Sequence, residues 1–133
     1  MRRPMLVALV ALLEVACGRL GQYTSLAIGG DGRGLVSYQD GPDGTLRVAH
    51  CEDGPCTRAT VNTLDRPFDR GGVQISVGPN TSLAIGQDGL GLVSYLDDHG
   101  GPGGFDGSLK VAHCLDLSCT RATVSVLDAA SGP

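Results

Sequence analysis

The feature that most constrains the fold of this chain is an internal duplication. The segment TSLAIGGDGRGLVSYQD at residues 24–40 returns at residues 81–97 as TSLAIGQDGLGLVSYLD, with three positions changed. The segment at 43–65 likewise returns at 106–128, with sixteen of its twenty-three positions identical. A chain of 133 residues allows one small domain or two repeat units, and a fold that needs two separate large cores is excluded.

Each unit is predicted to form four short antiparallel strands. The runs are rich in Val, Ile, Leu, Thr and Tyr, and none has the length or the period of an amphipathic helix. Asp31-Gly32 and its equivalent Asp88-Gly89 follow the first strand, where a tight hairpin needs the positive φ that glycine supplies. A further strand is expected at residues 73–77, between the units. In the first unit the predicted strands cover residues 24–28, 34–38, 45–51 and 59–64.

A four-stranded unit that recurs after 57 residues is the pattern of a β-propeller blade. Glycine occurs 21 times and aromatic residues only five times, which indicates many turns and a core of small aliphatic side chains. Small or apolar residues fall on both faces of the strands, as expected for a sheet packed on two sides. The sequence therefore predicts an all-β fold of two four-stranded antiparallel propeller-like blades, which together form an incomplete propeller.

The chain is predicted to have five parts. Its first eighteen residues combine two arginines, a short apolar run and small residues, which is typical of a secretory signal peptide and too short for a spanning helix. Ala16 and Cys17 also resemble a bacterial lipoprotein signal, so Cys17 is a candidate for lipidation. The protein is thus expected to be secreted or at the cell surface, or alternatively lipid-anchored to a bacterial membrane. The parts are the leader at 1–18, the first repeat at 20–65, a linker at 66–76, the second repeat at 77–128 and a tail at 129–133.

Four of the five cysteines form two equivalent pairs, Cys51 with Cys56 and Cys114 with Cys119. Each pair spans the short loop between the third and fourth strands, where facing positions lie near disulfide range. A signal peptide would bring them into an oxidising compartment. We therefore predict one local disulfide in each repeat. The alternative is a zinc site that includes His50, which the opposite orientation of consecutive strand residues disfavours.

The sequence carries no recognisable catalytic, cofactor-binding or metal-binding motif. Its aspartates lie in glycine-flanked turns, where their usual role is to bond the backbone, and no pair of carboxylates stands out as a general acid and base. The net charge of −4 and the lack of a basic cluster argue against nucleic acid as a partner. We expect no enzyme activity and no cofactor, and we expect membrane contact only through the leader or a lipid anchor.

The pattern TSLAIGxDGxGLVSYxD followed by LKVAHCxDxxCTRATV resembles a tandem β-propeller-like repeat of secreted or surface-exposed bacterial proteins. The resemblance covers about residues 20–65 and 77–128. It implies a propeller-like assembly outside the cell, and it implies no catalytic residue. The chain departs from longer members of the family in having two units, and two blades leave edge strands and blade faces exposed.

Three arrangements would cover these exposed surfaces. The sequence is a fragment of a longer repeat protein, or its two sheets pack on each other as a small sandwich, or several chains assemble into a closed ring. For an intact gene we expect a homo-oligomer, because closure removes the most edges. A trimer is favoured, since this resembles the two-bladed lectins in which three chains form a six-bladed ring.

The expected function is binding or surface interaction, with a glycan or a protein as the ligand. Tyr38 and Tyr95 are equivalent and are the candidate ligand contacts, with core packing as their alternative role. A lectin is one version of this function, although the chain lacks Trp for stacking on sugars. The alternative from another class is a fragment of a propeller enzyme of the sialidase or glycosidase type, whose site resembles a cluster of arginines around a tyrosine nucleophile.

Overall fold

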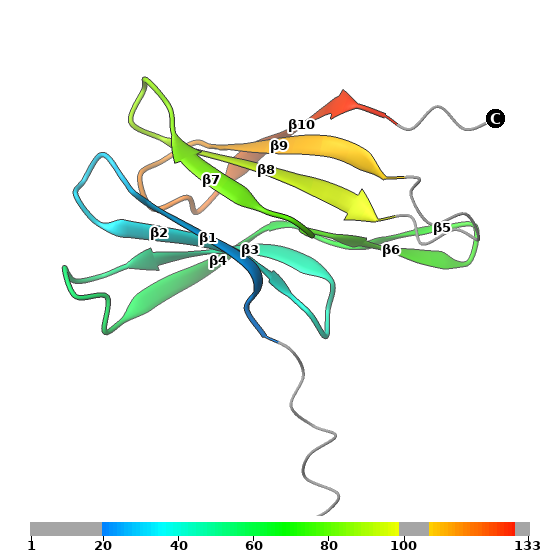
Figure 1. Ribbon diagram of the computed structural model, residues 1–133, viewed down its shortest axis with the longest axis horizontal. Helices are drawn as coiled ribbons and strands as arrows, with labels where there is room; N and C mark the ends of the chain where they lie inside the picture. Colours follow the sequence, from blue (N-terminus) through cyan, green and yellow to red (C-terminus); the bar gives the residue numbers. More distant parts are fainter. Residues whose placement is uncertain (1–19, 99–106, 130–133) are drawn as a thin grey trace, which may run out of the picture.

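Residues 20–98 and 107–129 are described by a computed structural model of the chain. This part of the chain contains two antiparallel β-sheets and no helix, which confirms the prediction of an all-β fold. Figure 1 shows the sheets one above the other, with the first repeat below and the second repeat above. The predicted leader, the lipidation candidate Cys17 and all of the predicted tail except Ala129 lie outside the described residues.

The first repeat forms a four-stranded sheet whose strands follow the order of the sequence. The four predicted strands are all present, and three of them extend one or two residues beyond the prediction. Gly32 and Gly44 have φ angles of 77° and 60° in the turns after the first and second strands, as expected for Asp-Gly turns. The strands are β1 (Gln22–Ile28), β2 (Gly34–Asp40), β3 (Thr45–Cys51) and β4 (Ala59–Asp65).

The second repeat and the linker form the second sheet. The order is β10-β9-β8-β6-β5, and β7 pairs with β8. Its strands are β5 (Phe68–Arg70), β6 (Val73–Val77), β7 (Ser82–Ile85), β8 (Gly91–Asp98), β9 (Ser108–Cys114) and β10 (Ala122–Asp128).

The linker is more ordered than the sequence predicts. The strand expected at 73–77 is confirmed as β6, and its pairing with β8 assigns it to the second sheet. Its hairpin partner β5 is not predicted by the sequence, because a run of three residues carries no detectable period. Gly71 and Gly72 connect the two strands with φ angles of 64° and 84°.

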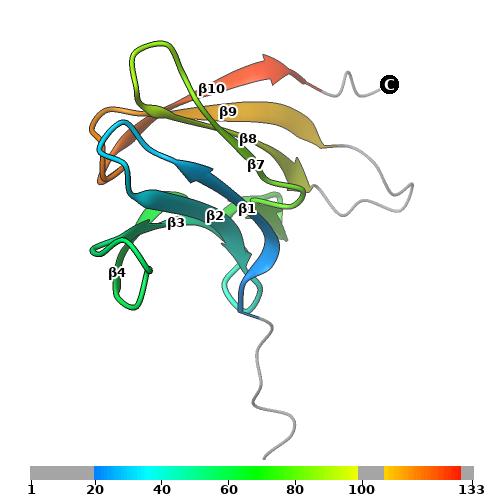
Figure 2. The same ribbon diagram turned by 60° about the vertical axis from the view of Figure 1, so that its left-hand side comes forward.

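The two sheets come closest along β1 and β7, which lie side by side in the middle of the molecule (Figures 1 and 2). The strands β4 and β10 lie on its far sides. Strand β6 also contacts the first sheet, where the backbone N–H of Val77 donates to the carbonyl of Gly44 at 2.8 Å. Buried side chains of both sheets form one core, so each repeat stabilises the other. This core includes Leu35, Leu46, Val48, Val93 and Tyr95.

Candidate functional site: two unpartnered sheet faces

Each repeat has two chemically different faces. Side chains alternate between the faces of a sheet, and the pairing register determines which residues share a face. The tyrosine face carries Leu26, Val36, Tyr38 and Ala49 in the first repeat and Leu83, Val93, Tyr95 and Ala112 in the second. The histidine face carries Leu35, Ser37, Val48 and His50 in the first repeat and Leu92, Ser94, Val111 and His113 in the second.

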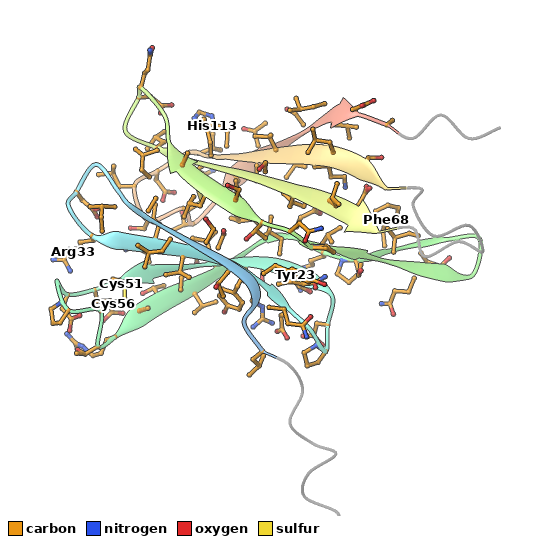
Figure 3. All side chains as sticks on the ribbon, viewed as in Figure 1. Tyr23, Arg33, Cys51, Cys56, Phe68 and His113 are labelled. Carbon is orange, nitrogen blue, oxygen red and sulfur yellow. A yellow bond between two sulfur atoms is a disulfide. The ribbon has the colours of Figure 1, made fainter. Side chains whose placement is uncertain are left out.

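The two sheets pack through non-equivalent faces, because the histidine face of the first repeat lies against the tyrosine face of the second. Leu35 and Leu83 in this contact are 1% and 7% exposed. Their equivalents on the other two faces, Leu92 and Leu26, are 36% and 63% exposed. Figure 3 accordingly shows His113 on the side of the second sheet that is turned away from the first. Each repeat therefore keeps one partly apolar face without a partner in the described part of the chain.

Polar groups hold the contact between the repeats in one register. The hydroxyls of Ser37 and Thr81 are hydrogen-bonded at 2.9 Å. Thr81 also donates to the carbonyl of Tyr23, and the backbone N–H of Leu83 donates to the Ser25 hydroxyl at 3.0 Å. Because these buried groups satisfy one another, a shift of one sheet along the other would leave several of them without partners.

Asp65, at the end of β4, is the main electrostatic contact between the two sheets. Its carboxylate accepts a hydrogen bond from the Tyr95 hydroxyl at 2.7 Å, and the Lys110 ammonium lies 3.3 Å away. Burial and the Asp65 carboxylate both raise the pKa of Tyr95 above its ordinary value. Lys110 also lies 3.2 Å from Asp97 and over the ring of Phe68. Asp65 was not predicted from the sequence. The signal that could have found it is its recurrence, because the second repeat has an aspartate, Asp128, at the equivalent position.

The equivalent polar groups of the first repeat are less completely paired. Arg47, which stands where the second repeat has Lys110, contacts Asp40 at 2.9 Å. The Arg47 Nε and Asp40 Oδ1 atoms are buried without a hydrogen-bond partner among the described residues. Tyr38 is half-buried on the free tyrosine face, whereas Tyr95 is buried in the core. Of the two candidate ligand contacts, only Tyr38 therefore lies on a free face of this chain.

A histidine–aspartate pair joins the third strand of each repeat to its Asp-Gly turn. Nε2 of His50 lies 2.8 Å from Asp31, and Nε2 of His113 lies 2.7 Å from Asp88. Desolvation raises the pKa of Asp31, but the Arg33 N–H and the His50 ring outweigh it and hold the pKa below its ordinary value. The pair occurs in both repeats and ties the third strand to the turn.

Both predicted disulfides are present, Cys51–Cys56 and Cys114–Cys119, and their cysteines are therefore unavailable for the alternative zinc site. In the second repeat both cysteines, Cys114 and Cys119, are buried at the contact between the sheets. In the first repeat Cys56 is exposed. Asp53 and Asp116 order the two loops by accepting hydrogen bonds from Thr57 and Thr120, respectively. Figure 3 shows the first disulfide at one end of the first sheet.

Other features of the described residues offer less for ligand recognition. A shallow pocket of about 150 Å³ near Gly44 and Pro67 is smaller than typical small-molecule sites of about 300 to 1,000 Å³. Within residues 20–98 and 107–129, no three His, Cys, Asp or Glu side chains are grouped so that they could hold a metal ion. The same residues include no helix long and apolar enough to cross a membrane.

No protein-family model, curated protein or solved structure matches this chain significantly. The resemblance to a repeat family of bacterial surface proteins therefore stays a prediction from the sequence. The candidate functional site consists of the two free faces, the tyrosine face of the first repeat and the histidine face of the second.

Proposed function

We propose that this chain is an exported, non-catalytic β-repeat protein that acts by binding or surface interaction, and that its repeats are propeller-like blades. The observation that carries the proposal is the pair of unpartnered faces. Most of their residues are identical in type to the equivalent residues on the two faces that are buried against each other inside the chain. Surfaces of this composition are suited to contact with another macromolecule.

The blade arrangement is supported by how the repeats meet. A small sandwich with internal two-fold symmetry would bring equivalent faces together, as in an isologous contact. Here non-equivalent faces meet, β1 and β7 are the neighbouring strands, and β4 and β10 are outermost. Successive blades of a propeller stack in this way, from an inner strand near the axis to an outer strand at the rim.

The non-catalytic role is supported by the positions of the titratable side chains. The histidines bond turn aspartates in both repeats, and Tyr95 is buried with Asp65. Each group thus has a structural partner. A catalytic site usually combines several different groups in one cleft, which two copies of one local pair do not provide.

Export is supported by the two disulfides together with the leader that the sequence predicts. Such bonds form and persist mainly in oxidising compartments. In the chain-entropy estimate, a loop closed over a sequence separation of 5 contributes roughly 2 kcal/mol to stability. For a small domain with few aromatic residues, two such contributions are a large part of the net stability.

The experiment that tests this proposal is expression of the full chain with its own leader in a bacterial host. We expect the protein outside the cytoplasm with both disulfides formed, as read by mass spectrometry after alkylation of free thiols. The purified protein should hydrolyse neither a chromogenic sialoside nor simple aryl glycosides. Retention in the cytoplasm with reduced cysteines would overturn the assignment to export, and hydrolysis would overturn the non-catalytic role. A glycan array with assembled protein then separates a lectin from a protein-binding module.

A further inference from the structure

We propose that the free tyrosine face of one chain binds the free histidine face of a second copy, in a head-to-tail contact that repeats the internal contact between the repeats. This inference rests on the proposed function, in which these faces are interaction surfaces. It adds the identity of the partner, which is a second copy of this chain.

The apolar residues of the internal contact are already present on the two free faces. On the tyrosine face, Leu26, Val36, Tyr38 and Ala49 are identical in type to their four buried equivalents in the second repeat. On the histidine face, Leu92, Ser94, Val111 and His113 are identical in type to their equivalents in the first repeat. A second copy would therefore meet a surface whose shape and chemistry the chain already packs against once. Leu20, which is exposed, likewise stands where the second repeat has the buried Val77.

The polar contacts of the internal interface can also form between copies. Thr24 and Ser94 are equivalent to Thr81 and Ser37, whose hydroxyls are hydrogen-bonded. Asp128 is equivalent to Asp65, so it can accept from Tyr38 of the next copy as Asp65 accepts from Tyr95.

The same carboxylate would complete the ion pairs of the free tyrosine face. Arg47 has a buried Nε atom without a partner among the described residues, and Lys110, its equivalent, reaches Asp65 across the internal contact. In a head-to-tail contact Asp128 of the neighbouring copy would lie next to Arg47. Arg47 already contacts Asp40 at 2.9 Å and Asp43 at 3.5 Å, and its side chain is 29% exposed. The added carboxylate would offer a partner to the buried Nε atom.

Two differences between the repeats partly compensate for each other in such a contact. A Cβ atom at Gly30 would lie 3.1 Å from the Gly89 carbonyl oxygen and 3.2 Å from the Leu117 side chain, so the internal contact needs glycine there. The second repeat has Gln87 at the position of Gly30, which adds a side chain to the histidine-face side. The first repeat has Gly54 at the position of Leu117, which removes a side chain from the tyrosine-face side. In a contact between copies this change removes the leucine side chain from the space that Gln87 needs. The carbonyl of Gly32, which is equivalent to that of Gly89, stays in place, so the backbone there must shift by a few tenths of an ångström.

The contact between copies is expected to be weaker than the internal contact. Gln39 and Asn62 donate hydrogen bonds across the internal interface, and Leu96 and Ser125 stand at their equivalent positions. Leu96 has no group to donate, and the serine side chain is shorter than that of asparagine. Because the two faces in contact are different, each added copy exposes the same two faces again. Such heterologous contacts close into a ring or continue as a filament.

The test uses complementation between two surface variants of the full exported chain. Leu26→Lys puts a charge on the free tyrosine face, and Leu92→Lys puts one on the free histidine face. Each variant alone should be monomeric, because every head-to-tail contact then includes one altered face. An equimolar mixture should form a dimer with one chain of each type, through the two unaltered faces. The masses are measured by light scattering on a sizing column from about 1 to 200 μM, the range of moderate affinities.

A matched control is Val61→Lys. Val61 is exposed on the tyrosine face of the first sheet. Its equivalent Val124 remains exposed although the two repeats are in contact, so a contact between copies that repeats the internal one would not cover Val61. This variant should assemble as the wild type does. The Lys variants at the contact should weaken assembly more than about a hundredfold, because they lose leucine burial and desolvate a charge. Ala49→Arg and Ser94→Arg repeat the complementation test if either leucine variant fails to fold.

Several results would overturn the inference. One is a wild-type chain that stays monomeric at every concentration. A second is a mixture of the two variants that stays monomeric although both retain their disulfides and strand content. A third is a single variant that still dimerises alone, because that indicates contact between equivalent faces. The first result leaves the proposed function intact if export and the lack of hydrolysis are observed, so the two failures are distinguishable.

Discussion

The hydroxyl of Tyr95 provides the sharpest measurement of how strongly the two repeats are coupled within one chain. Tyr95→Phe removes the hydrogen bond to Asp65, which is 2.7 Å long, and keeps the buried ring in place. Hydrogen bonds to charged groups contribute about 1.5–3 kcal/mol to stability. Asp65 keeps its contact with Lys110 at 3.3 Å, so its charge is not left unpaired. We therefore expect the free energy of unfolding to fall by about 2 kcal/mol.

The internal duplication supplies the control for this measurement. Tyr38→Phe makes the same chemical change at the equivalent position, where the hydroxyl has no hydrogen-bond partner among the described residues. A surface change of this kind should alter stability by less than about 0.5 kcal/mol. Both changes are made in the Leu26→Lys background, so that self-association does not contribute to the result.

Urea denaturation followed by far-ultraviolet circular dichroism is the suitable assay, because the chain has no Trp for fluorescence. The midpoint should shift for Tyr95→Phe without a change in the slope of the transition. In a thermal scan, a loss of this size lowers the midpoint by about 8 °C for a domain near 100 residues. Equal effects of Tyr95→Phe and Tyr38→Phe would refute the reasoning, since they would show that the bond to Asp65 does not couple the sheets.

The packing of a glycine, the exposure of a disulfide and the pKa of a turn aspartate give three further predictions. Gly91→Ala should destabilise the fold by about 1–3 kcal/mol, because its Cβ would lie 2.9 Å from the Cys114 sulfur, whereas Gly54→Ala, with open space around it, should be neutral in urea denaturation. Mild reductant should open the disulfide of the first repeat before that of the second, because Cys56 is exposed. Peptide mapping after alkylation of the freed thiols measures the order, and the reverse order would contradict this prediction. Asp31→Asn should destabilise the chain above pH 4 and progressively less in more acidic solution. The reason is that the pKa of Asp31 is held below its ordinary 3.8, so the contribution of its carboxylate to stability is lost as it protonates. A difference in unfolding free energy between variant and wild type that is the same at pH 3 and pH 6 would contradict this.

Much of the local structure could be predicted from the sequence because it depends on neighbours along the chain. The Asp-Gly turns adopt positive φ at Gly32 and Gly89 because glycine has no Cβ to clash. The disulfides form between residues five positions apart. Cys51 and Cys114 end β3 and β9, whereas Cys56 and Cys119 lie in the loops that follow, so the pairs are local but are not facing strand positions as the sequence predicts. The strand at 73–77 is likewise visible as a short segment between glycines in which apolar and polar residues alternate.

The contacts between the sheets could not be predicted in the same way. Nothing near Asp65 in the sequence indicates that Tyr95 and Lys110, which are 30 and 45 residues away, will bond to it. The strand β5 is missed for a related reason. Three residues next to Pro67 form a strand only because β6 is available to pair with them.

Identical turns, strands and disulfides in the two repeats could be expected from the sequence alone, because those features depend on short segments that are nearly identical. Which faces meet depends on the packing of the two sheets in space. Leu26 and Leu83 lie in identical TSLAI segments, yet one is 63% exposed and the other 7%. Burial depends on what lies opposite a side chain in space, and a repeated segment carries no information about which of its copies will be covered.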